Sequence, residues 1–227
     1  MLVYGKNGAY EALKHGSVNK VYLSRNFSDE KLLKLIDKKL IEYLSDGELS
    51  RYGKNHQGIV LDIDDYKFYS LDDLYNDNNA SFIVILDHLE DPHNFGAILR
   101  TCECAGVDYV IIPNKRSVSV NDTVMKTSSG ALMNSKIISV ANLHNTLERL
   151  KKLGFWITGL EADGTDYKKI DFSGKTVLVI GSEGFGLKHI VRESCDNIAS
   201  IPMKGEITSL NASVAAGIII YEVVRNR

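Results

Sequence analysis

Three segments of this chain share a layout that could build one composite binding site. They are Ile83–Arg100, Val177–Leu187 and Ile201–Gly217, and each runs from apolar residues typical of a strand through a polar turn into a helix. The start of a helix leaves backbone N–H groups without partners, and such groups bind polar or anionic ligands. Three such turns in one α/β domain favour a single shared site, although an ordinary helix cap is the alternative for any one of them.

Five side chains within these turns could take part in chemistry: Asn94, Arg100, Glu183, Ser209 and Asn211. Arginine pairs with phosphate and with developing negative charge, whereas amide, hydroxyl and carboxylate groups can orient a bound ligand. For Asn94 the alternative is a helix cap. For Arg100 it is a solvated position on a helix, and for Glu183 a carboxylate that stabilises a helix start.

The glycines of the second turn, Gly181-Ser-Glu-Gly-Phe-Gly186, permit tight backbone turns and close approach of a ligand. Their spacing differs from the GxGxxG of dinucleotide-binding folds, and the GK[ST] of a phosphate-binding loop is missing. No acidic ribose ligand is evident either. A nicotinamide oxidoreductase is therefore the weakest function considered.

Composition bounds the class of protein. The 227 residues suffice for one large or two small domains, and 44% hydrophobic with 25% charged residues is ordinary for a soluble protein. No apolar run reaches transmembrane length, and the N-terminal residues lack the layout of a signal peptide. Three cysteines cannot pair completely and no His/Cys cluster has zinc spacing, so we expect a reduced, cytoplasmic location and no metal.

Charge is unevenly distributed along the chain. The net charge of −2 argues weakly against a nucleic-acid partner. However, residues 1–60 hold ten Lys/Arg against seven Asp/Glu, whereas residues 61–80 hold one against six. The chain therefore has a mildly basic head, an acidic connector and a neutral body. Because phosphate binding depends on local basic patches, the head is the part expected to contact a nucleic acid.

From Phe82 onward, strands and helices alternate. The expected strands are Phe82–Leu86, Asp108–Ile112, Ser135–Val140, Phe155–Leu160, Thr176–Ile180 and Asn197–Ile201. The expected helices are approximately 95–105, 121–131, 142–153, 187–195 and 212–224. Short apolar strands alternating with helices predict a mostly parallel sheet that helices cover on both faces.

The head has its own pattern. Val18–Ser24 and Gln57–Ile63 are typical of strands, and a helix capped by Ser28 carries apolar residues at helical spacing as far as Leu44. Asp64–Ser81 is rich in Asp, Asn, Ser and Tyr, which predicts a surface connector. The expected division is a head of residues 1–66, a linker of residues 67–80 and a body of residues 81–227.

In this order and spacing, Asn94…Arg100, Gly181-Ser-Glu183-Gly and Ser209-Leu-Asn211 resemble the three signature motifs of the SpoU (TrmH-like) RNA 2′-O-ribose methyltransferases, which belong to the SPOUT class. The resemblance covers the body from about residue 82 to the C-terminus. The residues of these three motifs show no departure from the family's pattern.

The resemblance extends to the head. Tyr4-Gly and His56-Gln-Gly58 resemble the L30e-like RNA-binding domain that precedes the methyltransferase domain in some members. The two-domain layout and the wording Ile201-Pro-Met…Ser209-Leu-Asn211 are most similar to the branch that methylates a guanosine in the P loop of 23S rRNA. The runner-up within the family is a tRNA 2′-O-methyltransferase, which usually lacks such a head. A non-catalytic RNA-binding or ribosome-assembly protein is the alternative from another class.

The resemblance implies an α/β body with a deep C-terminal trefoil knot and a small L30e-like α/β head. It implies S-adenosylmethionine as cofactor, held largely by backbone groups, with Gly181, Ile201 and Leu210 as the matching contacts. It also implies a homodimer in which the helix Ala212–Val224 lies at the interface. The composition of that helix leaves no polar face, so we expect it to be buried on most sides, which packing within one protomer would explain equally well.

The resemblance assigns the role of base to Arg100. Neutralising a guanidinium at neutral pH costs roughly 7 kcal/mol, so we expect Arg100 to contact the reacting oxygen or the adjacent phosphate and to accept the proton late, if at all. Asn94, Glu183, Ser209 and Asn211 would hold Arg100 and the ribose in place.

In the head, a cluster of polar residues precedes the second strand, and Tyr52 is available for stacking on a base. The candidate RNA contacts are Arg51, Lys54, His56 and Gln57. A solvated loop is the alternative. His88, His93, His144 and His189 have no evident partners in the sequence and are expected to be structural or surface residues.

Overall fold

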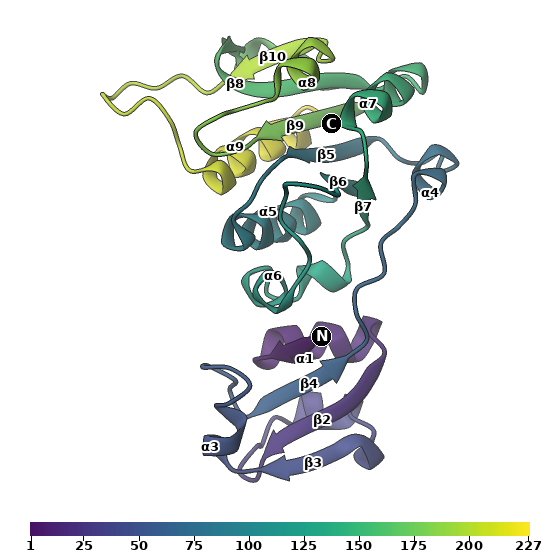
Figure 1. Cartoon of the computed structure of the whole chain (residues 1–227), viewed down its shortest axis with the longest axis vertical. Coiled ribbons are helices and arrows are strands. Elements are labelled where there is room, and N and C mark those ends of the chain that lie inside the picture. The colour runs from purple at the N-terminus through teal and green to yellow at the C-terminus, as the bar shows by residue number, and fades with distance from the viewer. The chain divides into compact units, whose positions relative to one another are not determined.

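The computed structural model describes all residues, 1–227, as two compact units (Figure 1). The first unit is Met1–Lys67 together with Val120–Asn134, and the second is Phe68–Ser119 together with Ser135–Arg227. The predicted division placed residues 120–134 within the body and left residues 67–80 as a linker. In the structure the first unit is discontinuous in sequence, and residues 68–80 are part of the second unit.

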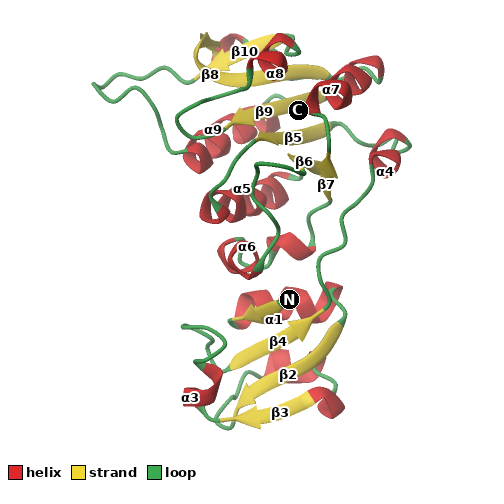
Figure 2. Ribbon diagram, viewed as in Figure 1, coloured by secondary structure: helices red, strands yellow, loops and turns green.

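The second unit is built on a six-stranded sheet (Figure 2). Its strand order is β10-β8-β9-β5-β6-β7, and every neighbouring pair is parallel. The strands are β5 (Phe82–Asp87), β6 (Tyr109–Pro113), β7 (Ile137–Val140), β8 (Trp156–Asp166), β9 (Thr176–Gly181) and β10 (Asn197–Ser200). The predicted parallel sheet is confirmed, because strands covered on both faces are continuously apolar and stand out in the sequence.

Helices cover both faces of this sheet, as predicted. Those of the second unit are α4 (Leu71–Tyr75), α5 (Pro92–Ala105), α7 (Leu143–Lys152), α8 (His189–Glu193) and α9 (Ala212–Arg225), with a 3₁₀ turn η3 at Tyr167–Lys169. On one face α5 packs against α9, and α9 against β9. On the other face, α7, α8 and α4 close a core that includes Leu74, Leu147 and Val191.

The acidic segment after the head is not a plain surface connector. Leu74 and Ala80 are buried in the core of the second unit, and Tyr69 forms a parallel bridge with Ile138 of β7. Ser70 caps α4 by accepting the N–H of Asp73. Most of its polar side chains are exposed, as predicted, but the short capped helix α4 anchors the segment to the core through Leu74.

The first unit contains a four-stranded sheet in the order β1-β4-β2-β3. Its strands are β1 (Leu2–Tyr4), β2 (Val18–Ser24), β3 (Ile41–Leu44) and β4 (Ile59–Ile63), and only the β2–β3 pair is parallel. Its helices are α1 (Lys6–His15), α2 (Glu30–Leu35), α3 (Asp46–Leu49) and α6 (Asp122–Thr127), with 3₁₀ turns η1 (Lys38–Leu40) and η2 (Ala131–Met133). The predicted small α/β domain is therefore confirmed.

The predicted helix from Ser28 to Leu44 is wrong in its cap, which is Asp29 and not Ser28, and in its second half. The helix α2 begins after Asp29, whose carboxylate accepts the N–H of Leu32, and it ends at Leu35. The residues that follow form a 3₁₀ turn and then β3, which pairs with β2. The apolar spacing fits either structure, and pairing with β2 decides between them. None of the helices in the chain combines the length and apolarity needed to cross a membrane.

Candidate active site

The first of the three polar turns follows β5 and begins α5. Asp91 caps the helix by accepting the N–H groups of His93 and Asn94, and Pro92 occupies the first helical position. Asn94 therefore lies inside the helix and is not its cap. The Asp-Pro pair is a recognisable start signal for a helix, and it could have identified Asp91 from the sequence. The side chain of Asn94 is buried and is available for other contacts.

Asn94, Glu183 and Asn211 meet in one hydrogen-bonded triangle. Asn94 Nδ2 donates to Glu183 Oε1 at 2.6 Å. Asn211 Nδ2 donates to Asn94 Oδ1 and to Glu183 Oε1, both at 3.0 Å. A carboxylate oxygen only accepts, so it fixes the orientation of both amides and directs their N–H groups inward. The structure thus brings together one side chain from each of the three turns.

The same contacts hold the start of α9. Asn211 is its N-cap, and its Oδ1 accepts the N–H groups of Ser213 at 3.0 Å and Val214 at 3.4 Å. Glu183 Oε1 lies 3.4 Å from the N–H of Ala212. Glu183 and Asn211 therefore contact the start of α9 and also bond to the other turns.

The second turn is a tight loop closed on itself, the glycine loop Gly181–Leu187. Ser182 and Gly186 exchange both backbone hydrogen bonds, at 3.1 and 3.0 Å. A Cβ at Gly181 would overlap the carbonyl of Gly186, so the two ends of the loop touch. Gly184 and Gly186 have φ angles of 84° and 64°, which only glycine adopts without strain. This loop presents Glu183 to the two asparagines.

The remaining predicted residues of the body surround these turns along the chain. Arg100 is exposed on α5, two turns beyond the cap. Ile201 is half-buried directly after β10, whereas Ser209 and Leu210 are exposed just before α9. No cluster of three His, Cys, Asp or Glu side chains is arranged to hold a metal ion.

In the head, the four candidate RNA contacts divide into two groups. Arg51 and Lys54 are exposed. His56 and Gln57 hold the turn before β4, because His56 Nδ1 accepts the N–H of Gly58 at 3.0 Å and Gln57 Oε1 accepts the N–H of Lys6 at 2.8 Å.

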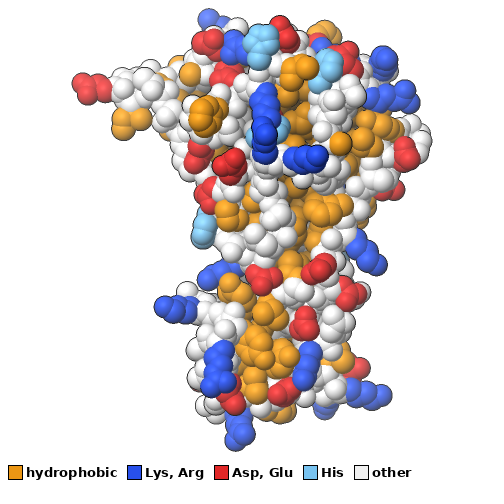
Figure 3. Space-filling model, viewed as in Figure 1, with side chains coloured by type: hydrophobic (Ala, Val, Ile, Leu, Met, Phe, Trp, Pro, Cys, Tyr) orange, Lys and Arg blue, Asp and Glu red, His pale blue; other side chains and the backbone are white.

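Tyr52 is already stacked on Tyr22 of β2, with ring centroids 4.9 Å apart. One face of the Tyr52 ring is thus covered by Tyr22 and cannot stack on a base. Basic and acidic side chains are interspersed on the face in view in Figure 3, without one continuous basic field.

Two family models match the chain. The SpoU rRNA Methylase family matches residues 81–221, which include all three turns. The chain belongs to the SpoU rRNA methylase family. A second model, RNA 2′-O ribose methyltransferase substrate binding, matches residues 2–69. The chain thus has both parts of an RNA 2′-O-ribose methyltransferase, a SpoU domain and a substrate-binding domain.

Individual proteins agree with this membership. A putative TrmH family tRNA/rRNA methyltransferase from Staphylococcus saprophyticus is 42% identical over 222 residues, covering 96% of this chain and 86% of the relative. The crystal structure of the SpoU methyltransferase AviRb from Streptomyces viridochromogenes, in complex with the cofactor AdoMet, has a TM-score of 0.85 and 26% identity over 99% of this chain and 89% of that one. The TrmH/SpoU tRNA modifying enzyme of A. aeolicus has a TM-score of 0.58 and 33% identity, over 69% of this chain and 80% of its own.

The SpoU methyltransferase AviRb was solved in complex with the cofactor AdoMet, and the residues of this chain fit such a ligand. Of the residues that the sequence predicts as cofactor contacts, Gly181 offers backbone groups, and Ile201 and Leu210 offer half-buried and exposed apolar side chains. Gly184 has no atoms within 4 Å of its Cβ position. A ligand that is recognised through backbone and apolar groups suits such a lining.

Proposed function

We propose that this SpoU protein transfers a methyl group from S-adenosylmethionine to the ribose 2′-oxygen of a guanosine in the P loop of 23S rRNA, and that it does so as a homodimer. The observation that carries the proposal is the triangle of Asn94, Glu183 and Asn211, which joins three turns beside the glycine loop. A pure binding protein needs no such oriented cluster, so an enzyme is favoured over a non-catalytic assembly factor.

The head favours rRNA over tRNA as the substrate. The substrate-binding model accounts for residues 2–69, and relatives named tRNA/rRNA methyltransferases match almost the whole chain. The A. aeolicus tRNA modifying enzyme matches only 69% of the chain. A separate substrate-binding head supports a larger, structured RNA substrate, with Arg51 and Lys54 as exposed phosphate contacts.

The proposed reaction depends more on the alignment of the two reacting groups than on general acid–base catalysis. The bound cofactor supplies an electrophilic methyl group. The protein must place the ribose 2′-oxygen in line with it, and positioning of this kind contributes several kcal/mol. We assign Arg100 to the reacting oxygen or the neighbouring phosphate, with Ser209 and the triangle holding the ribose. Because a deoxyribose lacks the 2′-OH, a substrate with deoxyribose at the target should be inert.

The exposed face of α9 supports the dimer. Val214 and Tyr221 are each 51% exposed, and Val224 is 36% exposed. Their spacing of seven and three residues places them on one side of the helix. The sequence predicted burial on most sides, and a single protomer leaves this apolar side uncovered. A second copy of the chain would bury it.

The decisive experiment supplies methyl-labelled S-adenosylmethionine with unmodified 23S rRNA, 16S rRNA or tRNA and then identifies the labelled nucleoside. We expect 2′-O-methylguanosine in 23S rRNA alone. Label in tRNA would retain the chemistry and overturn the substrate. Saturable cofactor binding without label in any RNA, including assembly intermediates, would favour the non-catalytic alternative.

Arg100→Lys separates chemistry from binding. Lysine keeps the charge but loses the planar fork of the guanidinium. We expect turnover to fall while RNA affinity stays within a few-fold of wild type. Near-complete turnover with intact RNA affinity would contradict the role assigned to Arg100.

A further inference from the structure

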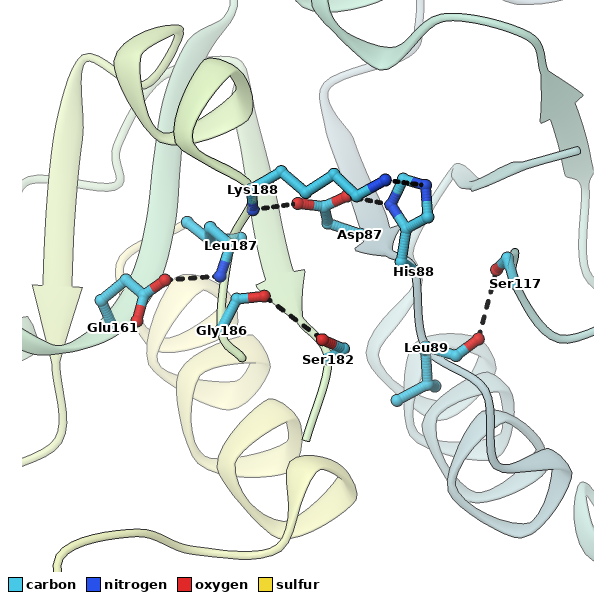
Figure 4. Close-up of polar contacts among 9 residues, drawn as sticks. All are labelled: Asp87, His88, Leu89, Ser117, Glu161, Ser182, Gly186, Leu187 and Lys188. Carbon is cyan, nitrogen blue, oxygen red and sulfur yellow. Dashed lines mark hydrogen bonds and ion pairs between the residues drawn. The ribbon is translucent and has the colours of Figure 1, made fainter. Parts of the chain in front are cut away.

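Two carboxylates, one on each side of β9, accept backbone hydrogen bonds at the end of the glycine loop (Figure 4). β9 lies between β8 and β5 in the sheet. Glu161 of β8 accepts the N–H of Leu187 at 2.5 Å, and Asp87, the last residue of β5, accepts the N–H of Lys188 at 2.7 Å. The N–H of Leu187, the last residue of the loop, and the N–H of Lys188, the residue after it, are therefore held by carboxylates from the two flanking strands.

Glu161 lies directly against the loop backbone. A Cβ at Gly186 would lie 2.5 Å from Glu161 Oε1 and 2.6 Å from Oε2. The glycine therefore serves two needs: it adopts the left-handed φ of 64° and leaves room for this carboxylate. Leu187, which follows it, is buried in the core between the sheet and α8.

Asp87 is fully buried, and its second oxygen is occupied as well. Its Oδ1 lies 2.5 Å from Nδ1 of His88, and Nε2 of the same ring lies 2.6 Å from the ammonium of Lys188. An ammonium only donates, so Nε2 must accept and the ring proton must lie on Nδ1. Lys188 is thus linked to Asp87 twice, directly through its backbone N–H and indirectly through its ammonium and the ring of His88.

His88 has a φ of 58°, an unfavourable conformation for a residue with a Cβ. Its ring contacts tie the turn after β5 to the residue that follows the glycine loop. The sequence gives His88 no evident partner, because Lys188 lies 100 positions away and the adjacent Asp87 contacts the ring only in the turn that follows β5. Asp87 and Glu161 were missed for the same reason.

We propose that Glu161 and Asp87 are positioning residues that hold the glycine loop in the shape that accepts the cofactor, with His88 and Lys188 completing the hold on Asp87. The inference rests on the proposed function in one respect, namely that the loop from Gly181 onward binds S-adenosylmethionine. A loop fixed before binding loses little conformational freedom on binding, so its affinity depends on whatever fixes it.

Calorimetric titration with S-adenosylmethionine tests Glu161. We expect Glu161→Ala to raise Kd at least tenfold, whereas Glu161→Gln, which keeps an acceptor oxygen, should restore most of the affinity. Asp163→Asn is the matched control, because it removes a carboxylate from the same strand that pairs with Arg192 of α8 and does not touch the loop. RNA affinity should be unchanged in all three variants.

Gly186→Ala provides a second route to the same contact. Alone, it should weaken cofactor binding, because its Cβ meets the Glu161 carboxylate and its φ is strained. Combined with Glu161→Ala, its effect should shrink, since the carboxylate is gone and only the strain remains. Strictly additive effects would mean that Glu161 does not act through the loop, and the proposal would fail.

Hydrogen exchange in the cofactor-free protein gives a readout that is independent of the proposed function. The N–H groups of Leu187 and Lys188 should be protected in the wild type. Glu161→Ala should expose the first, and Asp87→Ala the second. If exchange at these amides were unchanged in both variants, Glu161 and Asp87 would not hold the loop, even if cofactor binding fell. If exchange changes as expected but the wild-type protein binds no S-adenosylmethionine, the two carboxylates do hold the loop. The role of the loop in cofactor binding, and the proposed function, would then be wrong.

Discussion

Asn211 serves the helix and the site with different atoms of one amide. Its oxygen caps α9, and its nitrogen donates to Asn94 and Glu183. Serine caps a helix about as well as asparagine but cannot reach both partners. We expect Asn211→Ser to change the free energy of unfolding by less than about 1 kcal/mol and to lower methyl transfer by roughly tenfold or more, the loss expected for hydrogen bonds to a charged group.

Thermal unfolding and turnover, measured on the same samples, check this prediction. Asn142→Ala is the control, because Asn142 caps α7 and contacts none of the three turns. It should lower stability by about 1 kcal/mol and leave turnover unchanged. Equal losses of turnover in the two variants would show that Asn211 acts only as a cap.

For single residues, the sequence predicts which polar side chains lie in the turns but not which hydrogen bonds they form. Asn94, Glu183 and Asn211 were recognised as polar residues in turns, yet nothing local shows that side chains 89 and 117 positions apart meet. Asn94 was weighed as a cap, a role that Asp91 takes three residues earlier. Whether an amide caps its own helix or bridges to another turn depends on contacts that only the fold supplies.

The three cysteines should differ in reactivity. Burial raises the pKa of Cys102 well above its usual range and raises that of Cys195 to about 12, whereas Cys104 is exposed. Only the thiolate is nucleophilic, so at about pH 8 iodoacetamide should label Cys104 alone in the folded protein. Mass spectrometry of the labelled peptides checks this, and a denatured sample labelled at all three is the control.

The same shifts predict a loss of stability in alkali. A thiol that stays neutral in the folded protein but ionises in the unfolded chain contributes stability that is present below the ordinary thiol pKa. For Cys195 that contribution falls as the pH rises from 9.0 towards about 12.

Among the elements, α9 offers the clearest test of the dimer. Gly217 lies on the same side as Val214 and Tyr221, and a Cβ there would meet nothing within 4 Å in the protomer. In an isolated helix, alanine is favoured over glycine by roughly 0.8–1.0 kcal/mol. If a second copy packs closely on this side, we expect Gly217→Ala to weaken association despite that gain, as measured by sedimentation equilibrium.

Gly47→Ala is a suitable comparison, because Gly47 lies in α3 of the other unit and also has open space around it. It should leave the association constant unchanged. A Gly217→Ala protein that is simply more stable, with association intact, would count against α9 as the interface.

The elements were predictable wherever burial made them continuous. The six strands of the second unit were all predicted, because their buried parts are mostly apolar, although β8 continues past the predicted end at Leu160 to Asp166. The stretch after Leu35 was not, since Ile41 fits a helical face as well as a strand and pairs with Val21 of β2 only in the folded unit. A helical prediction built on spacing alone cannot detect a partner strand.

For the whole molecule, the segment 120–134 completes the first unit. Asp122 accepts the N–H of Leu2 at 3.0 Å, and Asn134 donates to Glu11 at 3.1 Å. We expect Asp122→Ala to lower the stability of the first unit by about 1–2 kcal/mol, because it leaves a half-buried N–H of β1 without its carboxylate. Hydrogen exchange of the Leu2–Tyr4 amides would report the change.

Asp65→Ala is the matched control. Asp65 pairs with the N-terminal ammonium at 3.2 Å, but its side chain is almost fully exposed, and exposed pairs contribute less than about 1 kcal/mol. If both variants left exchange in β1 unchanged, residues 120–134 would not stabilise the unit. Composition gave no sign of this arrangement, and the predicted boundary therefore assigned the segment to the body.

The discontinuous unit has a consequence for how the chain is made. Small domains commonly fold as soon as their last residue leaves the ribosome, the N-terminal one first. Here the first 67 residues lack α6 and η2 until residue 134 has been synthesised, and β5, α5 and β6 are made in the interval. The N-terminal sheet must therefore remain incomplete while the first strands of the second unit emerge, so the synthesis of the two units overlaps and the first unit cannot be completed before part of the second has been made.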